Sequence, residues 1–205
     1  MSDLNGLITQ ALQGDALTKL SRQIGSDEQQ TRSAALAALP ALLGAMKRNA
    51  STAEGATALS TALQSDHDGS ILDHLGGFLG GSFQNERAAN GTGILGHILG
   101  GQQETVQQGL SGATGLNLSQ ITKLLPLLAP IVMGALGRSQ RQQPQQDGGG
   151  LTDLLSGATS SAREQAPSGA LGMLTGFLDK DGDGDIKDDL LKEAGSSVLG
   201  KIFGR

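Results

Sequence analysis

Apolar residues recur with the spacing of an α-helix along most of this chain. The first set lies at i, i+3, i+4, i+7 and i+8, and it comprises Leu4, Leu7, Ile8, Ala11 and Leu12. Residues with that spacing share one face of a helix. Leu17, Leu20 and Ile24 continue a similar face as far as Gly25, a residue type that commonly ends helices. The pattern therefore predicts an amphipathic helical region that ends near residue 25.

Capping residues mark the start of the next helix. Asp27 and Gln30 have the spacing of a capping box, in which two side chains satisfy backbone N–H groups at a helix N-terminus. An alanine-rich stretch, residues 34–46, follows them. Pro40 lies inside this stretch and predicts a kink or a break, because proline removes one backbone hydrogen bond.

Two further segments complete the helical pattern. Ser51 and Glu54 repeat the capping-box spacing ahead of another helix. Residues 117–137 form the most apolar stretch of the chain, and we expect them in the core, bent by Pro126 and Pro130. Together these patterns predict an all-α fold, a multi-helical bundle with kinked helices.

The chain also repeats itself. Residues 40–48 match residues 130–138 at an offset of 90, and Pro, Gly, Ala and Arg coincide. At the same offset the capping pair described above corresponds to Asn117 and Gln120. We therefore expect two similar helices, each with a proline kink, in related environments. Chance similarity between helices rich in Leu, Ala and Gly is the alternative.

Composition changes abruptly after residue 137. Residues 138–150 have no apolar side chain outside proline, which is typical of a flexible linker rich in Gln and Gly. We divide the chain into a helical domain (1–137), a flexible linker (138–167) and a helix-loop-helix tail resembling an EF-hand (168–205).

Composition also narrows the classes of function. The chain has no Cys, which excludes disulfides and thiol catalysis, and it shows no basic stripe or aromatic platform for nucleic acid. The N-terminus lacks the features of a secretory signal. The longest apolar run, residues 124–136, is shorter than the roughly 20 residues that span a bilayer. We expect a soluble, cytoplasmic protein without a membrane span.

The sequence DKDGDGDIKDDL, residues 179–190, is the one stretch whose spacing specifies a chemistry. Asp179, Asp181 and Asp183 stand at positions 1, 3 and 5 of an EF-hand-type loop. Gly184 at position 6 provides the sharp turn, and Asp185 at position 7 offers its backbone carbonyl. Carboxylates at alternate positions converge on one point, where they suit a hard cation that takes six to eight oxygens. We predict a Ca²⁺ site here, with Mg²⁺ as the other candidate ion.

The loop departs from the full pattern at position 12, where Leu190 replaces the usual bidentate Glu. Asp188 and Asp189 are the available substitutes, so we predict an irregular site of weak affinity, with Kd somewhere around 10⁻⁵ to 10⁻³ M. A solvated acidic turn that caps a helix is the alternative. Residues 66–71 partly repeat the sequence of this loop, but only Asp66 and Asp68 stand at positions that match its carboxylates. We interpret that partial repeat as a helix cap, with a second ion site as the alternative.

The assembled motifs resemble a bacterial family, domain of unknown function 937. They are DHDGSILDHLGG (66–77), GTGILGHILGG (91–101), LLPLLAPIVMGALGR (124–138) and LDKDGDGDIKDDLL (178–191). The resemblance covers most of the chain outside the linker. It implies an all-helical fold related to YidB-like bacterial proteins, and it supplies no catalytic residue.

Without a Walker-type or HExxH motif, the sequence favours a non-catalytic binding or structural protein. In this hypothesis Ca²⁺ orders a tail that docks on its own helical core or on a protein partner of unknown identity. The alternative is an enzyme or effector with a His-containing site between the helical repeats, built from Asp73, His74 and His97. We interpret both histidines as structural. Self-association through the helices rich in Gly, Ala and Leu is a third hypothesis.

Overall fold

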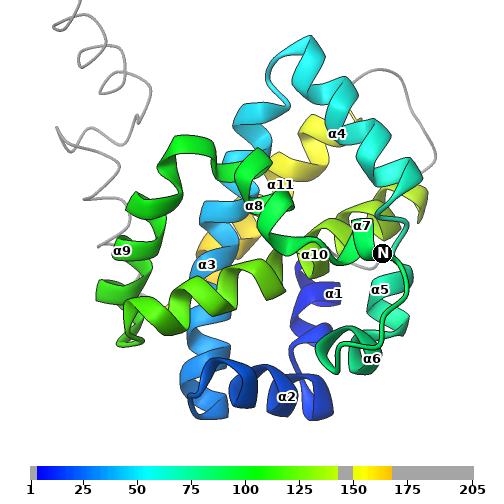
Figure 1. The fold of residues 1–205 in the computed structure, drawn as a ribbon. Coiled ribbons are helices and arrows are strands. Elements are labelled where there is room, and N and C mark those ends of the chain that lie inside the picture. Colours follow the sequence, from blue (N-terminus) through cyan, green and yellow to red (C-terminus); the bar gives the residue numbers. More distant parts are fainter. Residues whose placement is uncertain (1–3, 143–149, 168–205) are drawn as a thin grey trace, which may run out of the picture.

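The computed structural model describes residues 4–142 and 150–167, and all the regular secondary structure in these two ranges is helical (Figure 1). The predicted all-α fold is confirmed. The first half contains α1 (Leu4–Ala11), α2 (Gly14–Ile24), α3 (Glu28–Asn49), α4 (Ala53–Ser65), α5 (Ser70–Asp73), α6 (Leu75–Leu79) and α7 (Glu86–Ala89). The second half contains α8 (Gly91–Leu99), the 3₁₀ helix η1 (Gly100–Gln102), α9 (Gln103–Thr114), α10 (Leu118–Gln142) and α11 (Gly150–Gln165).

The repeat at an offset of 90 residues is visible in the helix boundaries. Helices α3 and α10 begin at Glu28 and Leu118, which are 90 positions apart. Helices α2 and α9 precede them and end at equivalent glycines, Gly25 with φ 73° and Gly115 with φ 75°. Both glycines have the left-handed conformation that lets a chain leave a helix without a Cβ clash. The similarity predicted for the two long helices therefore extends to the helices before them.

The capping pairs at these helix starts are also equivalent. The backbone N–H of Gln30 donates to Asp27 Oδ1 at 2.8 Å, and that of Gln120 donates to Asn117 Oδ1 at 2.9 Å. In the second pair the N–H of Asn117 also donates to Gln120 Oε1 at 2.9 Å. The third predicted cap is wrong by one residue, because Thr52 and not Ser51 accepts from the first turn of α4. The Ser51 hydroxyl instead donates to the Arg48 carbonyl at the end of α3.

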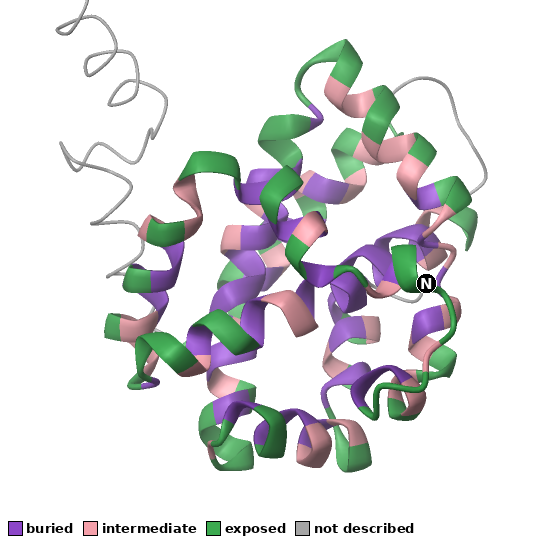
Figure 2. Ribbon diagram, in the orientation of Figure 1, coloured by how far each residue is buried: buried purple, intermediate pink, exposed green. Residues whose placement is uncertain are grey.

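The helix that precedes each long helix also packs on the long helix of the other half. Helix α2 contacts α10 as well as its own neighbour α3, and α9 contacts α3 as well as α10. The long helices bury equivalent positions, including Ala34 and Leu124, and Ala38 and Leu128. The two halves therefore interlock around one hydrophobic core (Figure 2).

The prolines lie inside continuous helices. Pro40 stands within α3, and Pro126 and Pro130 stand within α10. We predicted either a kink or a break at Pro40. The break is wrong, because α3 continues through this residue, and the kinks stay a prediction. Pro40 and Pro130 are buried at equivalent positions of the repeat, so both long helices omit one backbone hydrogen bond at the same level of the core.

The flexible linker predicted for residues 138–167 is wrong over the part that the structure describes. Residues 138–142 continue α10, and residues 150–165 form α11, which packs along α3 and contacts α1. Leu155, Ala158 and Ala162 are buried on one face of α11. The amide of Asn5 donates to the Ala158 carbonyl at 3.0 Å. The residues between the two helices and the predicted tail, 143–149 and 168–205, lie outside the described residues.

Helix α10 is the one described helix that is long and apolar enough to cross a membrane, with a mean hydropathy of 1.4 over an 18-residue window. That window is 72% buried inside the fold. Its apolar length therefore serves the core of this domain, as the sequence predicted for residues 117–137.

Two glycines of α10 allow the chain between α4 and α5 to lie against the helix. A Cβ at Gly137 would overlap the His67 carbonyl, and a Cβ at Gly134 would overlap the Ile71 side chain. In the repeat, Gly44 of α3 is equivalent to Gly134, but no atom outside its own helix backbone lies within 4 Å of its Cβ position. Glycine is thus required for packing at position 134 and not at the equivalent position 44.

The close approach of backbone at Gly137 and the open space at Gly44 give a prediction for two glycine substitutions. Gly137→Ala should lower the free energy of unfolding by about 1–3 kcal/mol, because the backbone of residue 67 must move away from α10. Gly44→Ala should raise it by roughly 0.5–1 kcal/mol, because alanine is favoured over glycine inside a helix. Urea unfolding followed by circular dichroism measures both. Equal effects of the two variants would contradict the close approach at α10.

Candidate functional site

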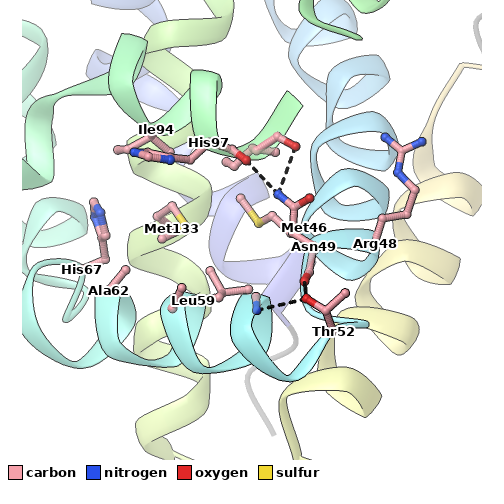
Figure 3. Close-up of a pocket in the computed structure, with 13 residues that line it drawn as sticks. Met46, Arg48, Asn49, Thr52, Leu59, Ala62, His67, Ile94, His97 and Met133 are labelled. Atoms are coloured by element: carbon pink, nitrogen blue, oxygen red, sulfur yellow. Dashed lines mark hydrogen bonds between the residues drawn. The ribbon is translucent and has the colours of Figure 1, made fainter. Parts of the chain in front are cut away.

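A pocket of about 570 Å³ lies between the two halves of the repeat (Figure 3). Helices α3 and α4 supply one side, and α8 and α10 supply the other. Its apolar lining residues are Met46, Ala58, Leu59, Ala62, Ile94, Ile98 and Met133. Its polar lining residues are Arg48, Asn49, Thr52, His67 and His97. The pocket is therefore an apolar chamber with a few polar groups, and these lie toward two ends (Figure 3).

At one end, the last residues of α3 hold the end of α8. Asn49 donates from Nδ2 to the carbonyls of His97 and Ile98, at 2.8 and 3.2 Å. Arg48 donates from Nη2 to Gln102 Oε1 at 2.5 Å. The two Asn49 bonds satisfy backbone carbonyls at the C-terminal end of α8, which otherwise lack partners within that short helix. They also fix the distance between the two walls of the pocket.

The same end contains the tight corner between α3 and α4. The backbone N–H of Gly55 donates to the Thr52 hydroxyl at 3.1 Å, which caps α4. A Cβ at Gly55 would overlap the Asn49 carbonyl, so α4 can start this close to α3 only with glycine there. The corner thereby places Ala58, Leu59 and Ala62 of α4 along the pocket.

His67 forms the other end of the pocket. Only 5% of this residue is exposed, and its Nδ1 is buried without a hydrogen-bond partner among the described residues. Burial lowers the pKa of the imidazole below its usual 6.5, while the charges of Asp66 and Asp68 act in the opposite direction. The ring is therefore neutral at pH 7. A buried lone pair is easier to leave unpaired than a buried N–H, so we assign the proton to Nε2.

Figure 3 shows the two pocket histidines on the same side of the chamber, with His67 directed from the end of α4 toward α8. His97 is exposed, and its backbone carbonyl is held by Asn49. Met133 of α10 lies between this side and the Asn49 end. The pocket thus has a histidine end, an apolar middle and an Arg48–Asn49–Thr52 end.

The structure does not bring together the histidine site predicted from Asp73, His74 and His97. His97 lines the pocket, but neither His74 nor Asp73 does. The Nδ1 of His74 lies 3.0 Å from the Ser70 carbonyl, and its ring centroid lies 6.3 Å from that of Phe83. Asp73 forms an ion pair with Arg138 at 2.5 Å.

The pocket instead uses His67, which was not among the residues predicted for a site. One signal for it was present, because His67 follows Leu63 at i+4 and so extends the apolar face of α4.

The acidic turn before α5 acts as a cap. The Ser70 N–H donates to Asp68 Oδ1 at 2.9 Å, as the capping interpretation predicted. The Ser70 hydroxyl, and then this backbone bond, lower the pKa of Asp68, so the carboxylate is ionised at neutral pH. Within residues 4–142 and 150–167 no three His, Asp or Glu side chains are grouped to hold a metal, so a second ion site has no support there. The predicted Ca²⁺ ligands, Asp179, Asp181, Asp183, Asp185, Asp188 and Asp189, lie outside the described residues.

A family model described as "Bacterial protein of unknown function (DUF937)" matches residues 6–139. The chain belongs to this family. The matched region begins within α1 and ends within α10, and it contains every residue that lines the pocket. No curated protein and no solved structure matches the chain.

The lowered pKa of His67 predicts a pH dependence of stability. Above pH 6.5 the imidazole is neutral in both the folded and the unfolded chain. Below that value the unfolded chain binds a proton that the folded chain does not, so the free energy of unfolding falls until the pH reaches the lowered folded pKa. His67→Gln should remove this part of the dependence of the free energy of unfolding on pH.

The measurement is urea unfolding at about pH 7.5 and about pH 5.5. The wild-type protein should lose more stability between these pH values than His67→Gln, and His97→Gln should behave like the wild type because His97 is exposed. Identical slopes for all three proteins would show that His67 does not resist protonation.

Proposed function

We propose that this protein is a non-catalytic binding protein whose helical domain holds a small, largely apolar molecule in the pocket between its two halves. The pocket carries this proposal. Its volume of about 570 Å³ lies within the range of roughly 300–1,000 Å³ typical of small-molecule sites. An apolar lining with a few polar groups is also what such sites have in common.

The arrangement of the polar groups supports binding over catalysis. Among the described residues no carboxylate hydrogen-bonds to the ring of His67 or His97, whereas a general base usually has a second group that orients it. The nearest acids to His67, Asp66 and Asp68, raise its pKa through their charge, but the Asp68 carboxylate is occupied by Ser70. The pocket histidines are better suited to contact a ligand than to transfer its protons.

The acidic loop at 179–190 adds a second binding function to the proposal. Three carboxylates at alternate positions followed by Gly184 support a Ca²⁺ loop, with Mg²⁺ as the other ion. Ion binding neutralises the loop and lets the apolar segments on either side approach. The ordered tail then docks on the helical domain or on a protein partner. We place the protein in the cytoplasm as a soluble protein.

Self-association through the helices receives less support. Leu118 is the one large hydrophobic residue that is exposed in the described part of the chain. The apolar faces of the helices rich in Gly, Ala and Leu are used within the domain core.

The pocket is tested with the methionine methyl groups that line it. Met46 and Met133 are two of the four methionines of the chain, and their ¹³C-labelled methyl signals report directly on ligand entry. Titration with decanol, an uncharged chain, should shift both signals saturably. Ala62→Phe, which places a ring in the pocket, should abolish the shifts, and Ala62→Ser should keep them because the pocket stays open. Unchanged methionine signals up to the solubility limit of decanol would contradict the pocket proposal.

The calcium loop is tested separately by calorimetry on the full chain. Wild-type protein should bind one Ca²⁺ with a Kd of about 10⁻⁵ to 10⁻³ M, and helix content should increase on binding. The double variant Asp181→Ala/Asp183→Ala should lose the binding, because two of the alternating ligands are removed. Wild-type protein that takes up no Ca²⁺ below millimolar concentrations would leave the loop as a capped acidic turn.

A further inference from the structure

We propose that the pocket ligand is an aliphatic carboxylate, bound with its carboxylate at Arg48 and its chain directed toward His67. This inference rests on the proposed binding function and adds the chemical class and the orientation of the ligand. It is carried by the charges at the two ends of the pocket and by the lining between them.

The Arg48 end has a cation that no acid neutralises. Among the described residues, ion pairs are made by Lys19 with Asp15, Arg138 with Asp73, and Arg141 with Asp68. Arg48 instead contacts Gln102 Oε1, a neutral amide oxygen. A guanidinium has five N–H donors in a planar fork that matches a carboxylate, so Arg48 keeps both its charge and most of its donors for a ligand.

The neighbours of Arg48 suit the same ligand group. Thr52 lines the same end of the pocket as the N-cap of α4, a helix whose N-terminal end favours a negative charge. Asn49 lines the same end, although its Nδ2 is occupied by the carbonyls of α8. Arg48 is exposed, so a carboxylate bound there remains partly hydrated and its transfer from water costs less than full burial.

The His67 end disfavours an anion. Asp66 and Asp68 flank the imidazole in sequence and act on it electrostatically. Asp68 is ionised and pairs with Arg141 at 3.7 Å, Asp66 makes no ion pair among the described residues, and burial keeps the ring neutral, so this end has no cation left over for an anionic ligand group. A ligand with one charged end therefore binds in one orientation only, with the charge at Arg48.

The middle of the pocket suits a flexible chain. Ile94, Ile98 and Met46 are at least 90% buried, and Met133 on α10 completes this lining. Methionine side chains adapt to irregular shapes, which is why they recur at sites that accept chains of different length. Each methylene buried in such a lining should increase affinity about fourfold until the chain reaches His67.

The experiment compares decanoate with decanol on the full-length protein, with the Met46 and Met133 methyl signals as readout. Wild-type protein should bind both molecules. Arg48→Gln should weaken decanoate binding by about 10- to 100-fold and leave decanol binding unchanged, because one charge-assisted contact is lost. Lys47→Gln is the matched control. It removes one positive charge from the adjacent position of α3, does not line the pocket, and should alter neither affinity.

The possible failures are distinguishable. If decanol binds but decanoate does not, or if Arg48→Gln weakens both equally, the carboxylate assignment is wrong and the binding function stands. Tighter binding of decylammonium than of decanoate would likewise overturn the proposed orientation of charge. If neither decanol nor decanoate shifts the methionine signals, the proposed function and this inference fail together.

Discussion

The fold depends on the burial of the middle of α10 on all sides. From Leu128 to Gly137 every residue of this helix is buried, so no single flat layer of neighbours can cover it. The chain covers it with α1, α2, α8 and α9 from the repeated segments and with α4 and α5 from the connection between them. Where the connection crosses α10, Gly134 and Gly137 remove the side chains that would hold it away. The domain is therefore a set of helices arranged around one long helix whose segment from Leu128 to Gly137 is enclosed on every side.

The pocket follows from this arrangement. Two equivalent long helices, α3 and α10, cannot be covered identically, because the chain after α3 continues into α4 and that after α10 leads on to α11. Helix α11 lies along α3. The chain after α3 instead turns sharply into α4, where Gly55 allows the close approach, and α4 contacts α10. The corner between α3, α4 and α8 is left incompletely filled, and Arg48 and His67 stand at its two ends. The asymmetry between the halves is thus the physical origin of the candidate site.

Much of the helical framework was predictable from the sequence, because capping pairs and apolar spacing are local signals. Asp27 with Gln30 and Asn117 with Gln120 predicted the starts of both long helices correctly. Helix α11 was missed because its polar composition resembles a linker. Its buried face can be recognised only when the helix is packed against α3, and that face consists of Leu155, Ala158 and Ala162. His67 was missed for a related reason. The i+4 spacing from Leu63 is a local signal, but Gly137, which lies against the His67 backbone carbonyl, is 70 residues away in the chain.

The position of α11 has a consequence for the order in which the chain acquires its structure. Asn5 and Ala158 are hydrogen-bonded although 153 residues separate them, and α11 covers the long helix of the first half. During synthesis α1 and α3 emerge from the ribosome well before the segment that completes their surroundings. Such long-range closure delays folding, and until it occurs the apolar face of α3 stays open to water or to chaperones. Nascent chains that end before residue 150 should therefore be the species that depend most on assisted folding.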